Sequence, residues 1–405
     1  MKGIHNFSEI GKLKKVMLHR IGNEVEGLVP DNFARLLFDD IPYLTAARRE
    51  HDRFADILRE NGVEVVYYID ELAEALSNQQ RKDEFLRHLV SKSDLESPAT
   101  EEALIGYLSS MDTKAMIEKI VAGVRRGEVP DYESPHFADY VSQGEAFYMD
   151  PLPNLYMSRD AGAAIGEGIS IHHMSTRTRR REALLLSYIY KYSRDFAEPE
   201  NRKWYDFDDP KSIEGGDILV LSDRLVAIGL SERTTPEAIE ILAGNLMKDT
   251  GFKRVIVVDI PKTRSTMQLD TIFSMVDHDK FVFHPEMSAP IDIYEMKHHK
   301  DGEISFSTMT GTLDEIIKKE LKLPAVDFIP CGGTDSMAAQ REQWNAASNI
   351  LALEPGVVIS YARNYITNEL LDRKGVKVIE TPGSELSRGR GGTRSMAFPL
   401  QREDI

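Results

Sequence analysis

Cysteine is almost absent from this sequence of 405 residues, and Cys331 is its single example. One thiol excludes an intramolecular disulfide and any metal site built from several cysteines. Long apolar runs are missing too, since no stretch approaches the roughly 18 residues that span a bilayer. Residues 1–7 lack the apolar core of a signal peptide, so we expect a cytoplasmic protein.

Positive charge is in deficit, with 66 acidic against 50 basic residues and a formal net charge of −16. This charge repels nucleic acid phosphates and anionic membranes, so we expect neither as a partner, and it permits a small cationic ligand. No glycine-rich phosphate loop follows a strand. The pairs His172-His173 and His298-His299 lack the companions and spacing of a metal site. We therefore expect no cofactor and no metal, and place these histidines at the surface.

Apolar periodicity predicts a mixed α/β protein, with 41% hydrophobic residues to fill one large core or two ordinary ones. Short β-rich runs alternate with amphipathic stretches through most of the chain. The strands expected are 14–20, 63–68, 218–221, 225–229, 255–258, 281–283, 326–329, 357–360 and 375–379, and the helices are 47–61, 237–248 and 313–321.

Residues 71–126 differ in character, because they are charged, favour helix and have almost no β-branched clusters. About four or five helices fit there. A segment rich in proline and acidic residues, 127–135, closes the stretch. We therefore expect an inserted helical domain with its linker at 71–147, and an α/β domain formed by 1–70 and 148–405.

The C-terminal segment from Arg388 to Arg394 holds three glycines and three arginines. Such a composition predicts a mobile cationic loop that delivers one side chain, Ser395, to a pocket. The run Glu385-Leu386-Ser387-Arg388-Gly389-Arg390-Gly391-Gly392 resembles the closing loop of the bacterial arginine deiminases, members of the guanidine-modifying (amidinotransferase) superfamily. The resemblance covers essentially the whole chain. It implies a five-bladed α/β propeller of ββαβ modules around a central site, with an inserted all-helical domain.

Two acidic motifs match the family's guanidinium ligands. The segment from Pro151 to Asp160 is a proline-braced loop that runs into a short strand, and Ser212 to Asp217 places a carboxylate before two glycines. On sequence alone, the first is as well explained by an exposed aspartate at a strand end, and the second by a turn. The resemblance implies that Asp160 and Glu214 bind the guanidinium group, which carboxylates accept in pairs.

The resemblance also implies residues for the ligand's α-substituents. Asn154 matches an asparagine that contacts them, and Arg179, Arg233 and Arg390 match arginines that hold the α-carboxylate. Each arginine taken alone is equally well explained by a solvated surface charge. Ala161-Gly162 departs from the family, whose members more often carry proline and a bulky residue there.

Two further departures concern catalysis. Arginine deiminases carry His-x-Asp where this chain has Gln268-Leu269-Asp270; the resemblance implies that Asp270 remains a guanidinium ligand. The family nucleophile is a cysteine where this chain has Ser395. Glutamine cannot titrate, and a serine hydroxyl needs a base to become a nucleophile. Cys331 lies far from this position, so we expect a structural role for it. His278 is a weak candidate for a replacement base.

Three hypotheses follow. The first is a pseudoenzyme of the arginine deiminase family that binds L-arginine or a related guanidino compound. The second is an arginine deiminase, converting L-arginine and water to L-citrulline and ammonia, that carries inactivating Cys-to-Ser and His-to-Gln changes. The third is a hydrolase or transferase with altered chemistry at Asp160, Glu214 and Asp270. Family members are often dimers or larger assemblies, so a homo-oligomer is a further expectation.

Overall fold

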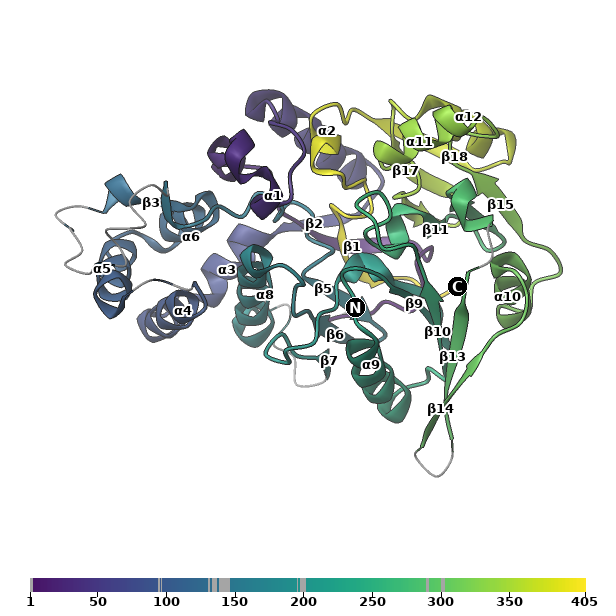
Figure 1. Cartoon of the computed structure of the whole chain (residues 1–405), viewed down its shortest axis with the longest axis horizontal. Helices are drawn as coiled ribbons and strands as arrows, with labels where there is room; N and C mark the ends of the chain where they lie inside the picture. Colours follow the sequence, from purple (N-terminus) through teal and green to yellow (C-terminus); the bar gives the residue numbers. More distant parts are fainter. Residues whose placement is uncertain are drawn as a thin grey trace.

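The protein is represented by a computed structural model that describes residues 3–93, 95, 97–129, 132, 137, 146–194, 196, 202–288, 291–299 and 303–405. Its fold is mixed α/β, with small sheets grouped together and a set of helices, α3 to α6, gathered at one end of the molecule (Figure 1). Within the described residues, no helix combines the length and the apolar character needed to cross a membrane.

Both ends of the chain meet in one sheet. Strand β1 (Leu13–Leu18) pairs antiparallel with the last strand, β19 (Phe398–Arg402), and parallel with β2 (Glu64–Tyr67). Helix α2 (Leu44–Glu60) connects β1 to β2 and buries one apolar face, including Phe54 and Leu58. The sheet therefore consists of an antiparallel pair followed by a helix and a parallel strand.

The same arrangement recurs in four further sheets of the described chain, in each of which two strands pair antiparallel and a third, reached through a helix, joins in parallel. They are β5 (Gly162–Ile165), β6 (Gly168–Ile171), α8 (Arg180–Tyr192) and β7 (Arg202–Tyr205); β8 (Ile218–Ser222), β9 (Leu225–Leu230), α9 (Pro236–Asp249) and β10 (Arg254–Asp259), extended by β13 (Ile293–His298) and β14 (Ile304–Thr308); β11 (Phe273–Met275), β12 (Lys280–Phe283), α10 (Leu313–Glu320) and β15 (Asp327–Pro330); and β16 (Leu351–Glu354), β17 (Val357–Tyr361), α12 (Tyr365–Arg373) and β18 (Lys377–Thr381).

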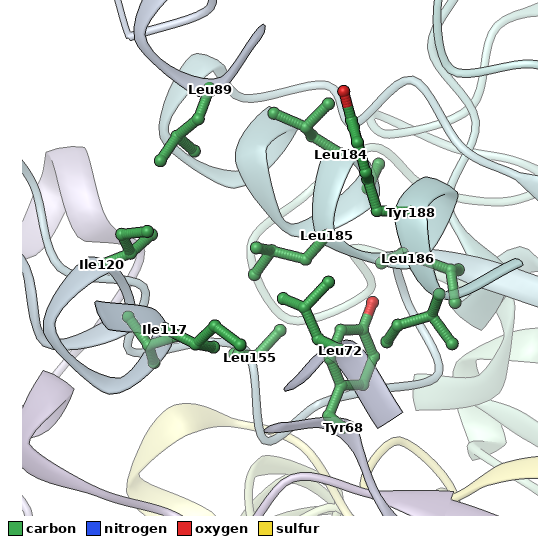
Figure 2. Packing of buried hydrophobic residues seen from close by; sticks show 14 of the residues in the cluster. Tyr68, Leu72, Leu89, Ile117, Ile120, Leu155, Leu184, Leu185, Leu186 and Tyr188 are labelled. Atoms are coloured by element: carbon green, nitrogen blue, oxygen red, sulfur yellow. The ribbon is translucent and has the colours of Figure 1, made fainter. Parts of the chain in front are cut away.

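Helices α3 (Tyr68–Ala75), α4 (Gln79–Ser91), α5 (Pro98–Ser109) and α6 (Thr113–Ala122) fall within or beside the stretch predicted to be helical. Side chains of Asn78, Ser97 and Asp112 accept backbone N–H groups at the starts of α4, α5 and α6, which satisfies otherwise unpaired donors. Figure 2 shows that Leu72 of α3 and Ile117 of α6 share one apolar core with residues of α8. The remaining elements are α1 (Phe33–Leu36), α11 (Ser336–Trp344), β3 (Val124–Arg125) and β4 (Phe147–Met149).

The predicted strands and helices are confirmed where the β-rich runs were clearest. Predicted strands 218–221 and 255–258 correspond to β8 and β10, and predicted helix 237–248 corresponds to α9. Helices α11 and α12 and the pair β13–β14 were not predicted. Part of the predicted boundary at 127–135, namely 130–131 and 133–135, lies outside the described residues. The division into two domains at the predicted limits stays a prediction.

Candidate active site

Segments at the ends of four different sheets meet at one small pocket. Asn154 and Asp160 lie between β4 and β5, and Arg179 ends the short helix that precedes α8. Ser395 lies in the segment before β19. The pocket is lined by Leu37, Asn154, Met157, Asp160, Arg179, Arg233, Arg264, Met267, Gln268, Thr271, Gly389, Arg390, Gly391 and Ser395. Residues separated by more than 200 positions are thus brought together, as the predicted set requires.

The pocket is small. Its cavity measures about 20 Å³, which is room for about one water molecule. Charged side chains from separate segments therefore surround a small space. Glu214 and Asp270 do not line the cavity. Glu214 accepts a hydrogen bond from the lining residue Gln268, and Asp270 directly precedes the lining residue Thr271 in the chain.

Two carboxylates in the site have an oxygen without a partner. Asp160 Oδ2 accepts a hydrogen bond from Arg179 Nη1 at 2.8 Å, and Asp270 Oδ2 accepts one from Arg394 Nη1 at 2.6 Å. The Oδ1 atom of each is buried and has no hydrogen-bond partner among the described residues. Buried polar atoms are normally paired, so each of these two oxygens can accept a hydrogen bond from a bound ligand.

Burial changes the charge preference of both aspartates. It raises the pKa of Asp270 to about 6, even though Arg394 lowers it. Burial also raises the pKa of Asp160, with Arg179 opposing the shift and Glu214 adding to it. A buried carboxylate gains most from a bound cation. Both residues are thus suited to hold a guanidinium group.

Glu214 is more fully paired. Ser175 donates to Oε1 through its backbone N–H at 3.1 Å and its hydroxyl at 2.9 Å, and Gln268 Nε2 donates to Oε2 at 2.8 Å. Arg233 Nη1 lies 3.7 Å from Oε2. Although burial opposes the charged form, Arg233 and Arg179 hold the pKa of Glu214 below its usual value. This carboxylate is therefore ionised at neutral pH.

Three of the four pocket arginines are held by carboxylates. Arg179 donates to Asp160 and also to both oxygens of Glu182, which lies in the first turn of α8. Arg233 donates to Glu232 at 3.1 Å. Arg264, which the sequence did not single out, donates to the Leu37 carbonyl and to Asp39. Its position four residues before Gln268 was the only available signal.

Arg390 differs from the others. It has a φ of 69° and stacks on the indole of Trp344, 3.3 Å from the ring centroid. The Nε and Nη1 atoms of Arg390 are buried and have no partner in the described chain. Burial lowers its pKa to about 10, so it stays charged at neutral pH. An anionic group in the pocket would accept hydrogen bonds from these two nitrogen atoms of Arg390.

The Ser395 segment is anchored by hydrogen bonds to two of its backbone N–H groups; the mobility expected from its glycines stays a prediction. Asn349 Oδ1 accepts the backbone N–H groups of Gly392 at 3.1 Å and Ser395 at 2.9 Å. Asn349 Nδ2 donates to the Asp270 carbonyl at 3.3 Å. One buried amide thus ties the segment to the Asp270 turn; sequence reasoning missed it, because it lies 46 residues from Ser395.

No base among the described residues contacts the Ser395 hydroxyl. Its hydroxyl has no hydrogen-bond partner within the described ranges, and the nearby Gln268 donates to Glu214 instead. The Gln268 side chain packs against Gly216, where a Cβ would lie 2.3 Å from Gln268 Oε1. Ser395 and Gln268 both line the pocket.

The histidine prediction is wrong at His172, which is fully buried behind Asp160. Its Nδ1 lies 2.8 Å from the Asp160 carbonyl oxygen, and burial lowers its pKa to about 4. His278 is exposed in the turn between β11 and β12. Cys331 is buried, with a pKa raised to about 12 by burial. The described residues contain no group of three or more potential metal ligands.

Comparison with known proteins shows which family the chain is similar to. The family model described as arginine deiminase matches residues 34–402. The chain belongs to the arginine deiminase family. It is similar to the arginine deiminase of Latilactobacillus sakei subsp. sakei, with 46% identity over 99% of this chain and 98% of the relative.

Solved structures of the wider superfamily share the fold. The amidinotransferase SxtG of Microseira wollei has a TM-score of 0.56 at 15% identity, with 99% of this chain and 98% of that chain covered. The DDAH of Pseudomonas aeruginosa, solved as a cysteine-to-serine mutant complexed with citrulline, has a TM-score of 0.53 at 16% identity, with 96% and 99% covered. The mixed α/β fold of this arginine deiminase family member is therefore that of the amidinotransferases and of DDAH.

Proposed function

We propose that this chain binds L-arginine, or a related guanidino compound, in the pocket between Asp160 and Arg390. The observation that carries the proposal is a set of buried atoms without partners. Among the described residues, the Oδ1 atoms of Asp160 and Asp270 have no donor, and the Nε and Nη1 atoms of Arg390 have no acceptor. A guanidinium group supplies paired donors and an α-carboxylate supplies acceptors, so arginine satisfies both sets.

Binding requires the pocket to open, because a cavity of about 20 Å³ does not hold an amino acid. Arg179 now fills part of the guanidinium position by donating to Asp160. We propose that the ligand's guanidinium replaces it there, with Glu214 as a further ligand. Arg179, Arg233 and Arg390 then hold the α-carboxylate, and Asn154 contacts the other α-substituents.

We propose further that the family's hydrolytic mechanism does not operate here. Loss of general acid–base help lowers a rate by about 10²–10⁴, and loss of a nucleophile that acts as part of a unit lowers it by about 10⁶. Ser395 and Gln268 combine both losses. On this proposal the chain is a pseudoenzyme that binds its ligand and releases it unchanged.

A second candidate is an arginine deiminase that carries inactivating changes. Arginine deiminases convert L-arginine and water to L-citrulline and ammonia. The comparisons favour it over a pseudoenzyme, because identity to the Latilactobacillus protein of that name is 46% over 98% of its length. On this candidate, Ser395 and Gln268 are inactivating changes on a scaffold that is otherwise complete. A third candidate, altered chemistry at the surviving carboxylates, predicts that some guanidino or amidino compound is consumed.

The test is a calorimetric titration with L-arginine, followed by citrulline and ammonia assays of the same samples. We expect binding without product. Steady citrulline formation would overturn the pseudoenzyme proposal but leave the binding proposal intact. The variant Ser395→Cys/Gln268→His separates the first two candidates, since an intact scaffold regains hydrolysis and a drifted one stays inactive. Absence of binding in every variant would overturn the binding proposal.

We also propose that the five sheets form the five-bladed propeller of the superfamily, with 71–147 as the inserted domain of an α/β body made of 1–70 and 148–405. The repeated antiparallel pair, helix and parallel strand supports this arrangement. A homo-oligomer, which the resemblance suggests, is tested by light scattering of the purified chain.

A further inference from the structure

The buried carboxyl group of Asp217 lies between segments that carry three of the proposed binding residues. Asp217 is fully buried and ends the short helical turn Gly215–Asp217 that precedes β8. It does not line the pocket around Asp160, and neither the sequence nor the resemblance assigned it a role. Its hydrogen bonds show how it is connected to that pocket.

Both oxygens of Asp217 accept hydrogen bonds. Oδ1 accepts the backbone N–H of Leu269 at 2.8 Å, and Oδ2 accepts the hydroxyls of Ser231 at 2.7 Å and Thr234 at 2.6 Å. The Ser231 hydroxyl also accepts the backbone N–H groups of Arg233 and Thr234, at 2.9 and 3.2 Å. Both lone pairs of this hydroxyl are thus used, so its proton goes to Asp217. The carboxyl group therefore has to be an acceptor at both ends.

Each of these hydrogen bonds reaches the segment of a proposed binding residue. Leu269 directly precedes Asp270 in the chain, so the bond to its N–H holds the turn that carries this ligand. Thr234 directly follows Arg233, and its hydroxyl oxygen accepts the backbone N–H of Glu214 at 3.2 Å. One carboxyl group thus connects three segments of the site, directly or through one hydroxyl.

The packing around this carboxyl group is close. A Cβ at Gly229 would lie 2.3 Å from Asp217 Oδ1 and 2.9 Å from the Cβ of Leu269. A Cβ at Gly216 would lie 2.9 Å from Asp270 Oδ1. The two glycines therefore allow β9 and the Glu214 segment to approach the Asp270 turn closely.

The three hydrogen-bond donors to Asp217 are neutral groups. Burial raises the pKa of Asp217 to about 8, although the three hydrogen bonds lower it, and the charge of Asp270 adds to the increase. A buried carboxyl group that is held only by neutral donors is unfavourable for stability. Strongly perturbed carboxyl groups also cluster at functional sites. The position that Asp217 gives to its neighbours explains its presence better than a gain in stability does.

We propose that Asp217 is a positioning residue of the arginine pocket. It holds the segments of Glu214, Arg233 and Asp270 at the mutual distances that a bound ligand requires. The inference rests on the binding function proposed above. Asparagine cannot replace the carboxyl group, because in either orientation its amide nitrogen faces a donor instead of an acceptor.

The test combines calorimetric titration with L-arginine and amide hydrogen exchange of the full chain. Asp217→Asn should weaken L-arginine binding at least about tenfold and speed the exchange of residues 266–271, because one buried donor loses its acceptor. Thr234→Val keeps the shape of the side chain but removes the hydroxyl that links Asp217 to Glu214. It should weaken binding about three- to tenfold, also where Asp217→Asn does not fold. The conservative variant Thr234→Ser keeps the hydroxyl and should bind within about twofold of the unsubstituted chain.

A double substitution tests the path through the Asp270 turn. Contacts that act as one unit are not additive. In the Asp270→Asn background, Asp217→Asn should therefore weaken L-arginine binding less than it does alone. Full additivity would overturn the role of the bond from the Leu269 N–H to Asp217.

A purely structural role predicts a different result. Asp112→Ala removes the side chain that accepts two backbone N–H groups at the start of α6, and Asp112 does not line the pocket. This control should lower the free energy of unfolding without changing L-arginine affinity. The same result for Asp217→Asn and Thr234→Val would overturn the inference, as would unchanged exchange of 266–271 in Asp217→Asn. If the unsubstituted chain does not bind L-arginine, the proposed function fails instead, and the exchange data still decide whether Asp217 holds that segment.

Discussion

Asp160 has one oxygen bound to Arg179, and its other oxygen is buried with no partner among the described residues. We expect Asp160→Asn to keep the side chain's shape and remove its charge. Because a hydrogen bond to a charged group contributes about 1.5–3 kcal/mol, L-arginine affinity should fall roughly ten- to hundredfold. Isothermal titration calorimetry measures the change, with the exposed Asp223→Asn as control. Equal affinity in the two variants would exclude Asp160 as a guanidinium ligand.

Asp270 gives the site a dependence on pH. Its pKa is about 6, raised by burial, and a guanidinium ligand needs the ionised form. Arginine affinity should therefore fall as pH decreases below about 6, by up to tenfold per pH unit for this group. Titrations from pH 5 to 8 measure the slope. In Asp270→Asn the slope from this group should disappear, and an unchanged slope there would refute the assignment.

The stability of the unliganded protein should respond in the opposite direction. A carboxyl group whose pKa is raised in the folded state binds more protons there than in the unfolded chain, where aspartate titrates near about 3.9. Its favourable contribution is therefore present below pH 4 and is lost as pH rises through about 6. Urea unfolding of the unsubstituted chain and of Asp270→Asn at pH 4 and pH 7 isolates this contribution from those of other acids.

At the scale of elements, the segment that carries Ser395 is fixed by Asn349, at the loop before β16. Asn349→Ala would leave the buried N–H groups of Gly392 and Ser395 unpaired. Each such group costs about 1–3 kcal/mol, so we expect the free energy of unfolding to fall by about 2–6 kcal/mol. Urea denaturation measures it. Asn345→Ala, which removes one hydrogen bond within α11, should cost less, and equal losses would contradict the anchoring role.

Sequence reasoning worked where an element is specified by its own residues. The run Val255-Ile256-Val257-Val258 predicts β10 because it is buried on both faces. Strand β14 is mostly exposed and is held by pairing with β13, so its sequence carries no comparable pattern. Helix α11 likewise lacks a clear apolar face and packs few of its own residues into the core.

Prediction of the site was limited in the same way, because contacts between distant segments leave no local pattern in the sequence. The resemblance to the arginine deiminases indicated Asp160, Glu214 and Asp270; the residues alone were as well explained by an exposed strand end at Asp160 and a turn at Glu214. The bonds between them were not predictable, since Asn349 and Ser395 become neighbours only through the packing of separate sheets. His172 was placed wrongly because a His-His pair looks polar; it follows a fully buried strand, and the Asp160 carbonyl satisfies its Nδ1.

At the scale of the whole molecule, the C-terminal strand β19 joins the two ends of the chain by pairing with β1. All five residues of β19 are buried, and Arg402 donates to the Gly11 and Ala352 carbonyls at 2.7 and 2.9 Å. Deleting residues 398–405 would remove Phe398 from the core and leave one edge of β1 unpaired. We expect loss of the cooperative unfolding transition, measured by near-ultraviolet circular dichroism and urea titration.

A chain that lacks only 404–405 is the matched control, because Asp404 is at the surface, where its Oδ1 lies 2.9 Å from His5 Nε2. It should unfold within about 1 kcal/mol of the full chain. The longer deletion should also abolish arginine binding, since the Arg159 N–H donates to the Ser395 carbonyl and Ser158 Oγ donates to that of Met396. These bonds join the Asp160 loop to the segment that β19 holds in place. Retained binding in the longer deletion would show that the pocket forms without this closure.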